Sequence, residues 1–458
     1  MQFTRFFEIP VLKSSTYSEM VIRPDCSVKS HAAIAAGLKA DGFEERFSAT
    51  NAALHTAILS NGEEVVTLCR NSATGELRVM REAAKYNDVT PLKKPEAVTE
   101  GEVILSQIGV GAYGHFEDDP VIGMLYLVKL ADGRALLIDG GMPCEECADD
   151  VYKALESHGI ARDADGKYAV AAWIFTHAHG DHIGAFNRFA PKYSDRVSVE
   201  YLLYNFPGDG NVASREADFP AFEKTIDDHF PTAKRVVPRA GAVYYFGNAA
   251  LRVLCSPDLL YTAGQRLPYF NNTSITLMLE ANGTKTLFMG DGGDAVAAKM
   301  LECLAPKVLK SDMVQITHHG LYTNAFITPR TPEELAVMTK EEKAEREAER
   351  HIHENLTRLY ETAAPSIGLW PMGDTNGQPR NGRTTVMQHW TRQYGQAAYF
   401  VDLDAEQVGY DGVNIVRKGD LVTYTASSET ELMITRFSLA DGRPTLLCNE
   451  KWLDFLAK

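Results

Sequence analysis

The chain has 458 residues, of which 45% are hydrophobic and 23% are charged, a composition typical of a globular protein with a buried core. Its 61 acidic residues outnumber 46 basic ones, and the net charge of −15 argues against partners such as nucleic acid or an anionic membrane. No apolar stretch is long enough for a transmembrane helix, and the N-terminus lacks the features of a signal peptide.

The first 96 residues mix short helix-like and strand-like pieces. Residues 27–42 are typical of a helix, and residues 63–83 predict a hairpin that turns at Ala73–Thr74–Gly75. The charged segment KKPEAVTEGE (93–102) contains Pro95 and Gly101 and predicts a linker. We therefore predict an N-terminal accessory α+β region over 1–96 and a main domain over 97–425.

From Val103 onward, apolar strands alternate with helical segments. Residues 122–141 predict two strands that end at Asp139–Gly140–Gly141, and residues 144–159 predict a helix. Residues 168–176 are a nearly continuous apolar run, as expected of a strand buried on both faces. This order is typical of an α/β fold whose functional site lies at the ends of strands.

Later segments continue the pattern. Residues 274–293 predict a hairpin about Asn282–Gly283, and residues 312–320 predict a strand that ends in two histidines. Residues 331–362 predict a helical insertion, whose charged part is a solvent face or, alternatively, a lid over the site. Residues 426–458 form a C-terminal accessory segment with a further hairpin at 431–452. We expect the terminal hairpins to pack together or to extend the main sheets.

The segment FTHAHGDHIG (175–184) concentrates three of the chain's 13 histidines. In an extended segment His177 and His179 project to the same side, so they can grip one metal ion. Asp181 and His182 follow Gly180, where the chain can turn, and can face a neighbouring position. The spacing suits two adjacent metal ions, which in hydrolases lie roughly 3.5–4 Å apart, and zinc accepts both His and carboxylate ligands.

Two coordination shells need further ligands from other strand ends. Asp291 ends an apolar strand between glycines and is well placed to bridge two ions, while His318 and His319 end the next strand. Asp139 also ends a strand and could orient a ligand histidine through a hydrogen bond.

HAHGDH (177–182) matches the H-x-H-x-D-H motif of the metallo-β-lactamase superfamily, and LLIDGG (136–141) resembles its first motif. NNTSITLML (271–279), MGD (289–291) and HHG (318–320) resemble the hydrolase domain of ComEC-type DNA-uptake proteins and the phosphorylcholine esterases. The resemblance spans roughly residues 100–400. It implies an α/β fold, an αββα sandwich with a dinuclear metal site at one sheet edge, and hydrolysis by a metal-bound hydroxide.

The resemblance also implies roles for the individual residues, with two divalent metal ions as cofactors, zinc in first place and manganese as the alternative. His177 and His179 would hold one ion, and Asp181 and His182 the other. Asp291 would bridge the two. We expect His318 to complete the second shell, with His319 closer to the substrate, so Asp181 and His319 are the candidate catalytic residues.

Two features depart from the family pattern. The superfamily has a further histidine between the first cluster and the bridging aspartate, whereas here that interval holds only His229, in DDHFPTAK. The ComEC-type branch carries an Asn-x-Tyr-Gly-His-Pro segment after HHG, whereas this chain has TNGQPRNG (375–382), without a histidine.

The seven cysteines are scattered and odd in number, which is not a disulfide framework and favours a cytoplasmic location. Cys144 and Cys147 form a C-x-x-C at the start of a predicted helix. A redox or metal role is one reading, since a helix N-terminus lowers a thiol's pKa. A single C-x-x-C is weak evidence, however, and two structural cysteines are the favoured interpretation.

The sequence thus predicts a metal-dependent hydrolase that acts on a small-molecule or phosphoester substrate, with no membrane partner. A lactone, thioester or β-lactam is the alternative substrate. A metal-binding module without catalysis is a further alternative, as is redox chemistry at a di-iron site. The di-iron branch usually carries Glu where this chain has His179, which argues against the di-iron alternative.

Overall fold

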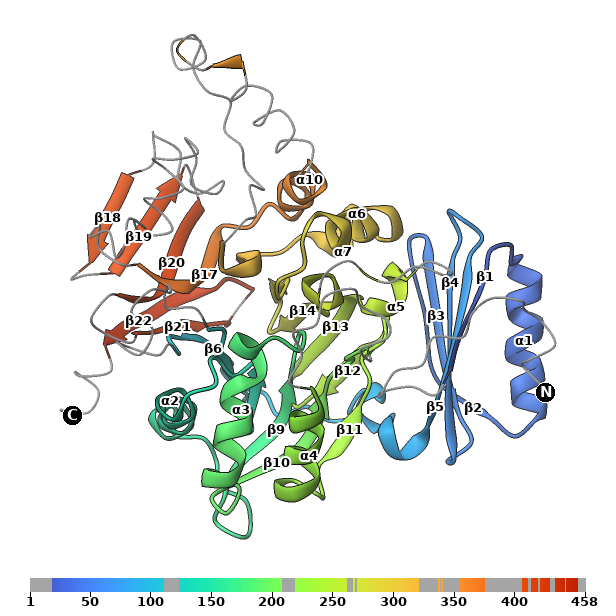
Figure 1. Cartoon of the computed structure of the whole chain (residues 1–458), viewed down its shortest axis with the longest axis horizontal. Helices are drawn as coiled ribbons and strands as arrows, with labels where there is room; N and C mark the ends of the chain where they lie inside the picture. The colour runs from blue at the N-terminus through green and yellow to red at the C-terminus, as the bar shows by residue number, and fades with distance from the viewer. Residues whose placement is uncertain are drawn as a thin grey trace.

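The structure is a computed structural model that describes residues 19–110, 123–207, 219–261, 267, 270–320, 337, 339–340, 354–374, 406–410, 413–418, 421–428, 433–440 and 442–451. Within these ranges the strands form a five-stranded, an eight-stranded and a nine-stranded sheet (Figure 1). The predicted insertion is described mainly from Glu354 onward, and residues 375–382 lie outside the described residues.

The N-terminal region forms its own antiparallel sheet, in the order β1-β5-β4-β3-β2. Its elements are β1 (Glu19–Arg23), α1 (Val28–Ala40), β2 (Glu44–Asn51), β3 (Leu54–Ser60), β4 (Glu64–Asn71) and β5 (Leu77–Ala83). Helix α1 starts at the cap residue Ser27 and packs Leu38 against Leu59 and Leu68 on one face of the sheet. The predicted helix at 27–42 and the hairpin at 63–83 are confirmed. Two short 3₁₀ turns, η2 (Ala84–Tyr86) and η3 (Thr90–Leu92), lead toward the main domain.

The eight-stranded sheet has the order β11-β10-β9-β8-β7-β6-β21-β22. Its strands are β6 (Ile104–Ile108), β7 (Tyr126–Lys129), β8 (Ala135–Ile138), β9 (Tyr168–Ile174), β10 (Val197–Leu203), β11 (Lys234–Val236), β21 (Met433–Ser438) and β22 (Thr445–Lys451). The helices α2 (Glu145–Ser157), α3 (Gly180–Tyr193) and α4 (Phe219–His229) connect its parallel strands.

The nine-stranded sheet has the order β12-β13-β14-β15-β16-β17-β20-β19-β18. Its strands are β12 (Val243–Phe246), β13 (Ala249–Cys255), β14 (Thr276–Ala281), β15 (Thr284–Phe288), β16 (Met313–Gln315), β17 (Ile367–Asp374), β18 (Glu406–Tyr410), β19 (Val413–Lys418) and β20 (Leu421–Ser428). Accompanying helices are α5 (Pro257–Leu260), η4 (Phe270–Thr273), α6 (Asp294–Cys303), α7 (Pro306–Leu309), η5 (Thr317–Gly320) and α10 (Glu354–Ala363).

The two large sheets pack face to face, and alternation along the strands builds the layers. Leu136 of β8 belongs to the core shared with Leu277 and Phe288 of the other sheet. Its neighbour Leu137 points the opposite way, into the core shared with Phe186 of α3. Helices α2, α3 and α4 cover one sheet and α6, α7 and α10 cover the other (Figure 1). The predicted αββα architecture is confirmed.

The two terminal hairpins have different positions. Strand β21 pairs with β6 in antiparallel fashion, Thr435 opposite Gln107, so the C-terminal hairpin extends the eight-stranded sheet as expected. The same expectation is wrong for the hairpin at 63–83, because β4 pairs with β3 and β5 with β1 in the separate sheet. No helix within the described ranges is long and apolar enough to cross a membrane.

Candidate metal centre

The predicted site residues lie where parallel strands end. Asp139 follows β8 and His177 follows its parallel neighbour β9, while Asp291 and His318–His319 follow the parallel pair β15 and β16. Helix α3 begins at Gly180 with His179 at its N-cap, so Asp181 and His182 lie in its first turn. The turn expected at Gly180 is thus the start of a helix, and it brings HAHGDH to the ends of the other strands.

The donor atoms gather in two groups that share Asp291. Asp181, His182, Asp291 and His319 offer atoms that all lie within 4.8 Å of one another, and so do His177, His179 and Asp291. The two oxygens of Asp291 divide between the groups: Oδ1 lies 3.1 Å from Nε2 of His182, and Oδ2 lies 3.6 Å from Nε2 of His177. A carboxylate placed between two sets of donors is what a bridging ligand requires.

The imidazoles are held by the nitrogen that faces away from the cluster. Nδ1 of His182 donates to Oδ2 of Asp139 (2.7 Å), and Nδ1 of His319 donates to the Pro371 carbonyl (3.0 Å). A carbonyl can only accept, so in the neutral imidazole this bond leaves Nε2 of His319 as the lone-pair nitrogen that a metal ion would need. That atom lies 3.2 Å from Nε2 of His182 and 3.0 Å from Oδ2 of Asp181. Convergent imidazole nitrogens and carboxylates form a donor set that fits a divalent cation such as zinc.

Asp139 orients His182 by a hydrogen bond and is itself held by its neighbours. Its carboxylate accepts from the Thr176 backbone N–H (2.7 Å) and hydroxyl (2.8 Å) as well as from His182. Its own φ of 58° is left-handed, and its carbonyl accepts from Nε1 of buried Trp173. These bonds keep a non-glycine residue in a strained conformation that aims its carboxylate at His182.

Both histidines of the HHG motif also have left-handed backbone, with φ of 51° at His318 and 52° at His319. The structure places His319 in the four-residue donor group, with its side chain 1% exposed. His318 lies outside both groups, 23% exposed, with Nε2 3.8 Å from Oδ2 of Asp291 and 3.2 Å from Nδ2 of Asn271. The geometry therefore favours the reverse of the expected order of the two histidines.

Electrostatics keep the two carboxylates charged. Burial alone would raise the pKa of Asp291, but the surrounding imidazoles, His182 first, hold it well below its usual value. Burial opposes ionisation of Asp181 too, yet His182 and His319 lower its pKa. Burial lowers the pKa of His177 well below its ordinary range, so that imidazole is neutral. Asp291 and Asp181 in turn raise the pKa of His182 and His319, so the buried carboxylates concentrate negative charge that attracts cations, whether protons on these imidazoles or a metal ion.

Sequence reasoning missed several supporting residues. Thr176 directly precedes the motif, and its hydroxyl lies 3.2 Å from Nδ1 of His177. Gln315 accepts from the Met289 N–H (2.7 Å) and donates to the Gly290 carbonyl (3.0 Å), which joins the end of β16 to the loop after β15. Buried polar residues next to a ligand motif are the signal that could have indicated them. His229 ends α4 and lies in neither donor group, so the structure provides no substitute histidine there.

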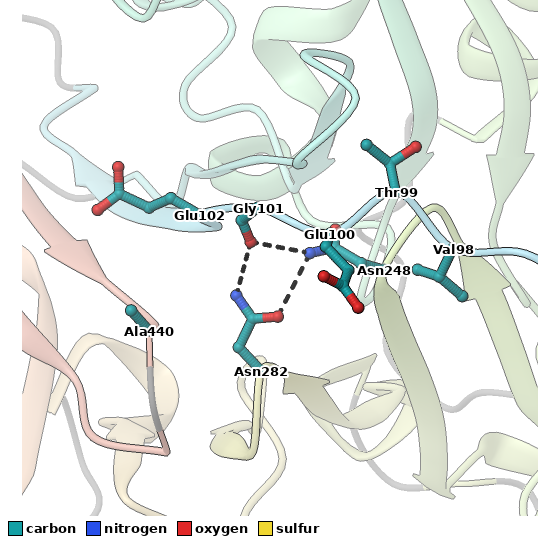
Figure 2. A pocket seen from close by; sticks show the side chains of 8 residues that line it. All are labelled: Val98, Thr99, Glu100, Gly101, Glu102, Asn248, Asn282 and Ala440. Atoms are coloured by element: carbon teal, nitrogen blue, oxygen red, sulfur yellow. Dashed lines mark hydrogen bonds between the residues drawn. The ribbon is translucent and has the colours of Figure 1, made fainter.

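A cavity of about 580 Å³ lies at the ends of the strands opposite to the metal centre, and Figure 2 shows its lining. Nδ2 of Asn282 donates to the Gly101 carbonyl (2.9 Å), and Nδ2 of Asn248 lies 3.4 Å from the same oxygen. Asn248 also accepts from the N–H of Ala131, in the turn that precedes β8. These amides fasten the linker to three turns, and none of the predicted site residues lines the cavity.

Comparison with known proteins agrees with this fold. Residues 118–249 match the metallo-beta-lactamase superfamily, so the chain contains a domain of that superfamily. A comparison with curated proteins finds no match.

Similar solved structures include Zn²⁺-bound PqqB from Methylobacterium extorquens (13% identity, 46% of this chain and 72% of that chain, TM-score 0.31). Another is a metallo-β-lactamase from Cronobacter sakazakii (13% identity, 53% of this chain and 81% of that chain, TM-score 0.29). A third is the short form of human tRNase Z (10% identity, 58% of this chain and 90% of that chain, TM-score 0.29). Likeness at this level carries no argument about substrate or metal.

Proposed function

We propose that this protein is a metal-dependent hydrolase of phosphodiesters or phosphoesters. Two divalent metal ions, zinc first and manganese second, would be held by His177, His179, Asp181, His182, Asp291 and His319. The observation that carries the proposal is the pair of donor groups sharing the buried carboxylate of Asp291. The odd number of scattered cysteines supports a cytoplasmic location.

Metal ions at these residues would supply an activated water and would stabilise negative charge on the substrate. The protein's part is to hold the donors still before substrate arrives. Asp139 fixes His182, the Pro371 carbonyl fixes His319, and Asp291 presents one oxygen to each group. Asp181 keeps its charge and would accept a hydrogen bond from the attacking water.

His318 is assigned to the substrate side of the centre. It is the more exposed of the two HHG histidines, and Nδ2 of Asn271 holds its Nε2 at 3.2 Å. From this position the imidazole would contact a phosphoryl or leaving-group oxygen. The preference for phosphorus over a carbonyl centre rests on the likeness of residues 271–279, 289–291 and 318–320 to phosphoesterase motifs. A lactone, thioester or β-lactam remains the alternative substrate.

The test is hydrolysis of bis(p-nitrophenyl) phosphate by protein reconstituted with zinc or manganese, alongside a count of bound metal. We expect two ions per chain and metal-dependent turnover that Asp181→Asn lowers by at least about 100-fold. His229→Gln is the matched control and should retain wild-type activity. Two bound ions without turnover would redirect the assay to lactones, thioesters and β-lactams, whereas no bound metal would refute the centre. Tightly held iron would favour redox chemistry.

A further inference from the structure

Cys144 and Cys147 form a close thiol pair at the start of α2. Their sulfurs are 2.7 Å apart and hydrogen-bonded, and the backbone N–H of Cys147 donates to Sγ of Cys144 (3.3 Å). Cys144 is the N-cap of the helix and is partly exposed, whereas Cys147 is fully buried. The pair thus combines an accessible sulfur with an inaccessible one, as an attacking and a resolving thiol require.

A buried carboxyl lies one helical turn beyond Cys147. Asp150 is 2% exposed, and its Oδ2 has no hydrogen-bond partner, while Oδ1 lies 3.2 Å from the ammonium of Lys153. Burial raises the pKa of Asp150 to about 7, and its charge in turn raises the pKa of both thiols. A carboxyl near its pKa at neutral pH can exchange protons with a neighbouring thiol.

The electrostatics distinguish the two sulfurs. The hydrogen bonds from Cys147 lower the pKa of Cys144 despite partial burial and the nearby charges of Glu146 and Asp150. The pKa of Cys147 is strongly raised, first by its hydrogen bond with Cys144 and then by burial. Cys144 therefore ionises first, and Cys147 needs a proton acceptor before it can react. The C-x-x-C alone favoured two structural cysteines, and Asp150 is the observation that changes this interpretation.

We propose that Cys144 and Cys147 form a reversible thiol–disulfide site for low-molecular-weight disulfides such as oxidised glutathione, with Asp150 as proton acceptor for Cys147. This site is independent of the proposed hydrolysis. The Cys144 thiolate attacks one sulfur of the small disulfide, which breaks that S–S bond and expels the first thiolate. Cys147 passes its proton to Asp150 and attacks Sγ of Cys144, expelling the second thiolate. The protein dithiol loses two electrons and two protons, and the small disulfide gains both to become two thiols.

The pair is adjacent to the metal centre but separate from its donor groups. The Gly140 N–H donates to the His182 carbonyl (2.7 Å), and the Ala185 N–H donates to the Gly141 carbonyl (3.1 Å). A Cβ on Gly184 would lie 2.5 Å from the backbone nitrogen of Pro143, so α3 packs directly on the loop that leads to Cys144. Neither cysteine belongs to a donor group, so the thiols can be titrated while metal is bound.

The experiment exposes the metal-loaded full chain to glutathione buffers of increasing oxidised fraction, quenches with acid, alkylates free thiols and locates them by peptide mass spectrometry. We expect Cys144 and Cys147 to lose alkylation together, with the loss of two hydrogens and no glutathione adduct, and to recover with dithiothreitol. Cys147→Ser should instead retain glutathione on Cys144, and Cys144→Ser should leave Cys147 unreactive. A wild-type protein that keeps both thiols free, or stops at the mixed disulfide, would overturn the proposal.

Asp150 has its own test. Asp150→Asn should slow closure of the mixed disulfide at neutral pH by at least about tenfold, because the buried thiol loses its proton acceptor. Asp149→Asn is the matched control, since that neighbouring carboxylate pairs with Lys192 and Tyr193 on the helix surface. Equal closure rates in Asp150→Asn and the wild type would overturn the role of Asp150.

Discussion

Arg239 is a fully buried cation that joins the N-terminal sheet to the main domain. Its Nη2 lies 3.1 Å from Oε2 of Glu82, at the end of β5, and its Nη1 pairs with Oδ1 of Asp258 in α5. All three side chains are at most 2% exposed. We predict that Glu82→Gln destabilises the protein strongly, although the substitution preserves shape.

The magnitude follows from the bonds of Glu82. One oxygen accepts from Nδ2 of Asn87 (2.6 Å) and the other from Arg239, whereas a glutamine has only one acceptor atom. Its amide NH₂ must therefore face another donor, and Arg239 loses one of two counter-charges. Breaking a buried pair costs about 3–5 kcal/mol, and because Asp258 remains we expect about 3 kcal/mol.

The assay is urea unfolding followed by tryptophan fluorescence, in a cycle of Glu82→Gln, Arg239→Met and the double variant. The double variant should cost less than the sum of the single ones by at least about 1 kcal/mol, because each single change deprives a buried charge of one counter-charge. Glu64→Gln is the control: its pair with Arg81 (2.6 Å) is about one-third exposed and should contribute no more than about 1 kcal/mol. A loss below about 0.5 kcal/mol for Glu82→Gln, or strict additivity, would refute the reasoning.

Three further outcomes are expected. Asp139→Asn should weaken metal binding by about 10–100-fold in chelator competition, because it removes the carboxylate that orients His182. Burial, together with Arg436, lowers the pKa of His158 from 6.5 to about 3, so its contribution to stability is complete above pH 6.5 and is lost as the pH falls toward 3. From pH 7 to pH 5 the wild type should therefore lose about 2 kcal/mol more than His158→Gln, measured by urea unfolding. Gly290→Ala should lower stability and metal content together, because φ of Gly290 is +56° and the new Cβ would lie 2.9 Å from Cβ of Thr176. Unchanged metal content would count against this prediction.

Several elements of the main domain could be predicted because their signals are local. The apolar run at 168–176, the Asn282–Gly283 turn and the punctuation of helix α2 each depend on a few neighbouring residues. The convergence of the site residues followed from one topological rule, that parallel strands present their carboxyl ends at the same edge of a sheet. The placement of the hairpin at 63–83 did not follow, because its strand signals do not specify which neighbouring strands it pairs with.

The buried network around Arg239 could not be predicted for a different reason. Glu82, Arg239 and Asp258 are far apart in the chain, and each alone has the character of an ordinary surface charge. Asp150 is similar. In the sequence it is simply an acidic residue after two cysteines, and only its burial makes it a candidate for proton exchange. Charged residues buried by tertiary packing carry no local signature.

The order of His318 and His319 depends on long-range contacts of the same kind. An extended strand end would send adjacent side chains to opposite faces, and the sequence offers no reason for two consecutive non-glycine residues to be left-handed. The loop is nevertheless held there, because the His318 N–H donates to the Gly290 carbonyl and the Thr317 hydroxyl donates to the Gly292 carbonyl. The Thr317 N–H is in turn held by the Tyr360 hydroxyl (3.0 Å) from α10. Which histidine faces the donor group is therefore decided by residues some 30 and 40 positions away, and Tyr360 links the insertion helix to that choice.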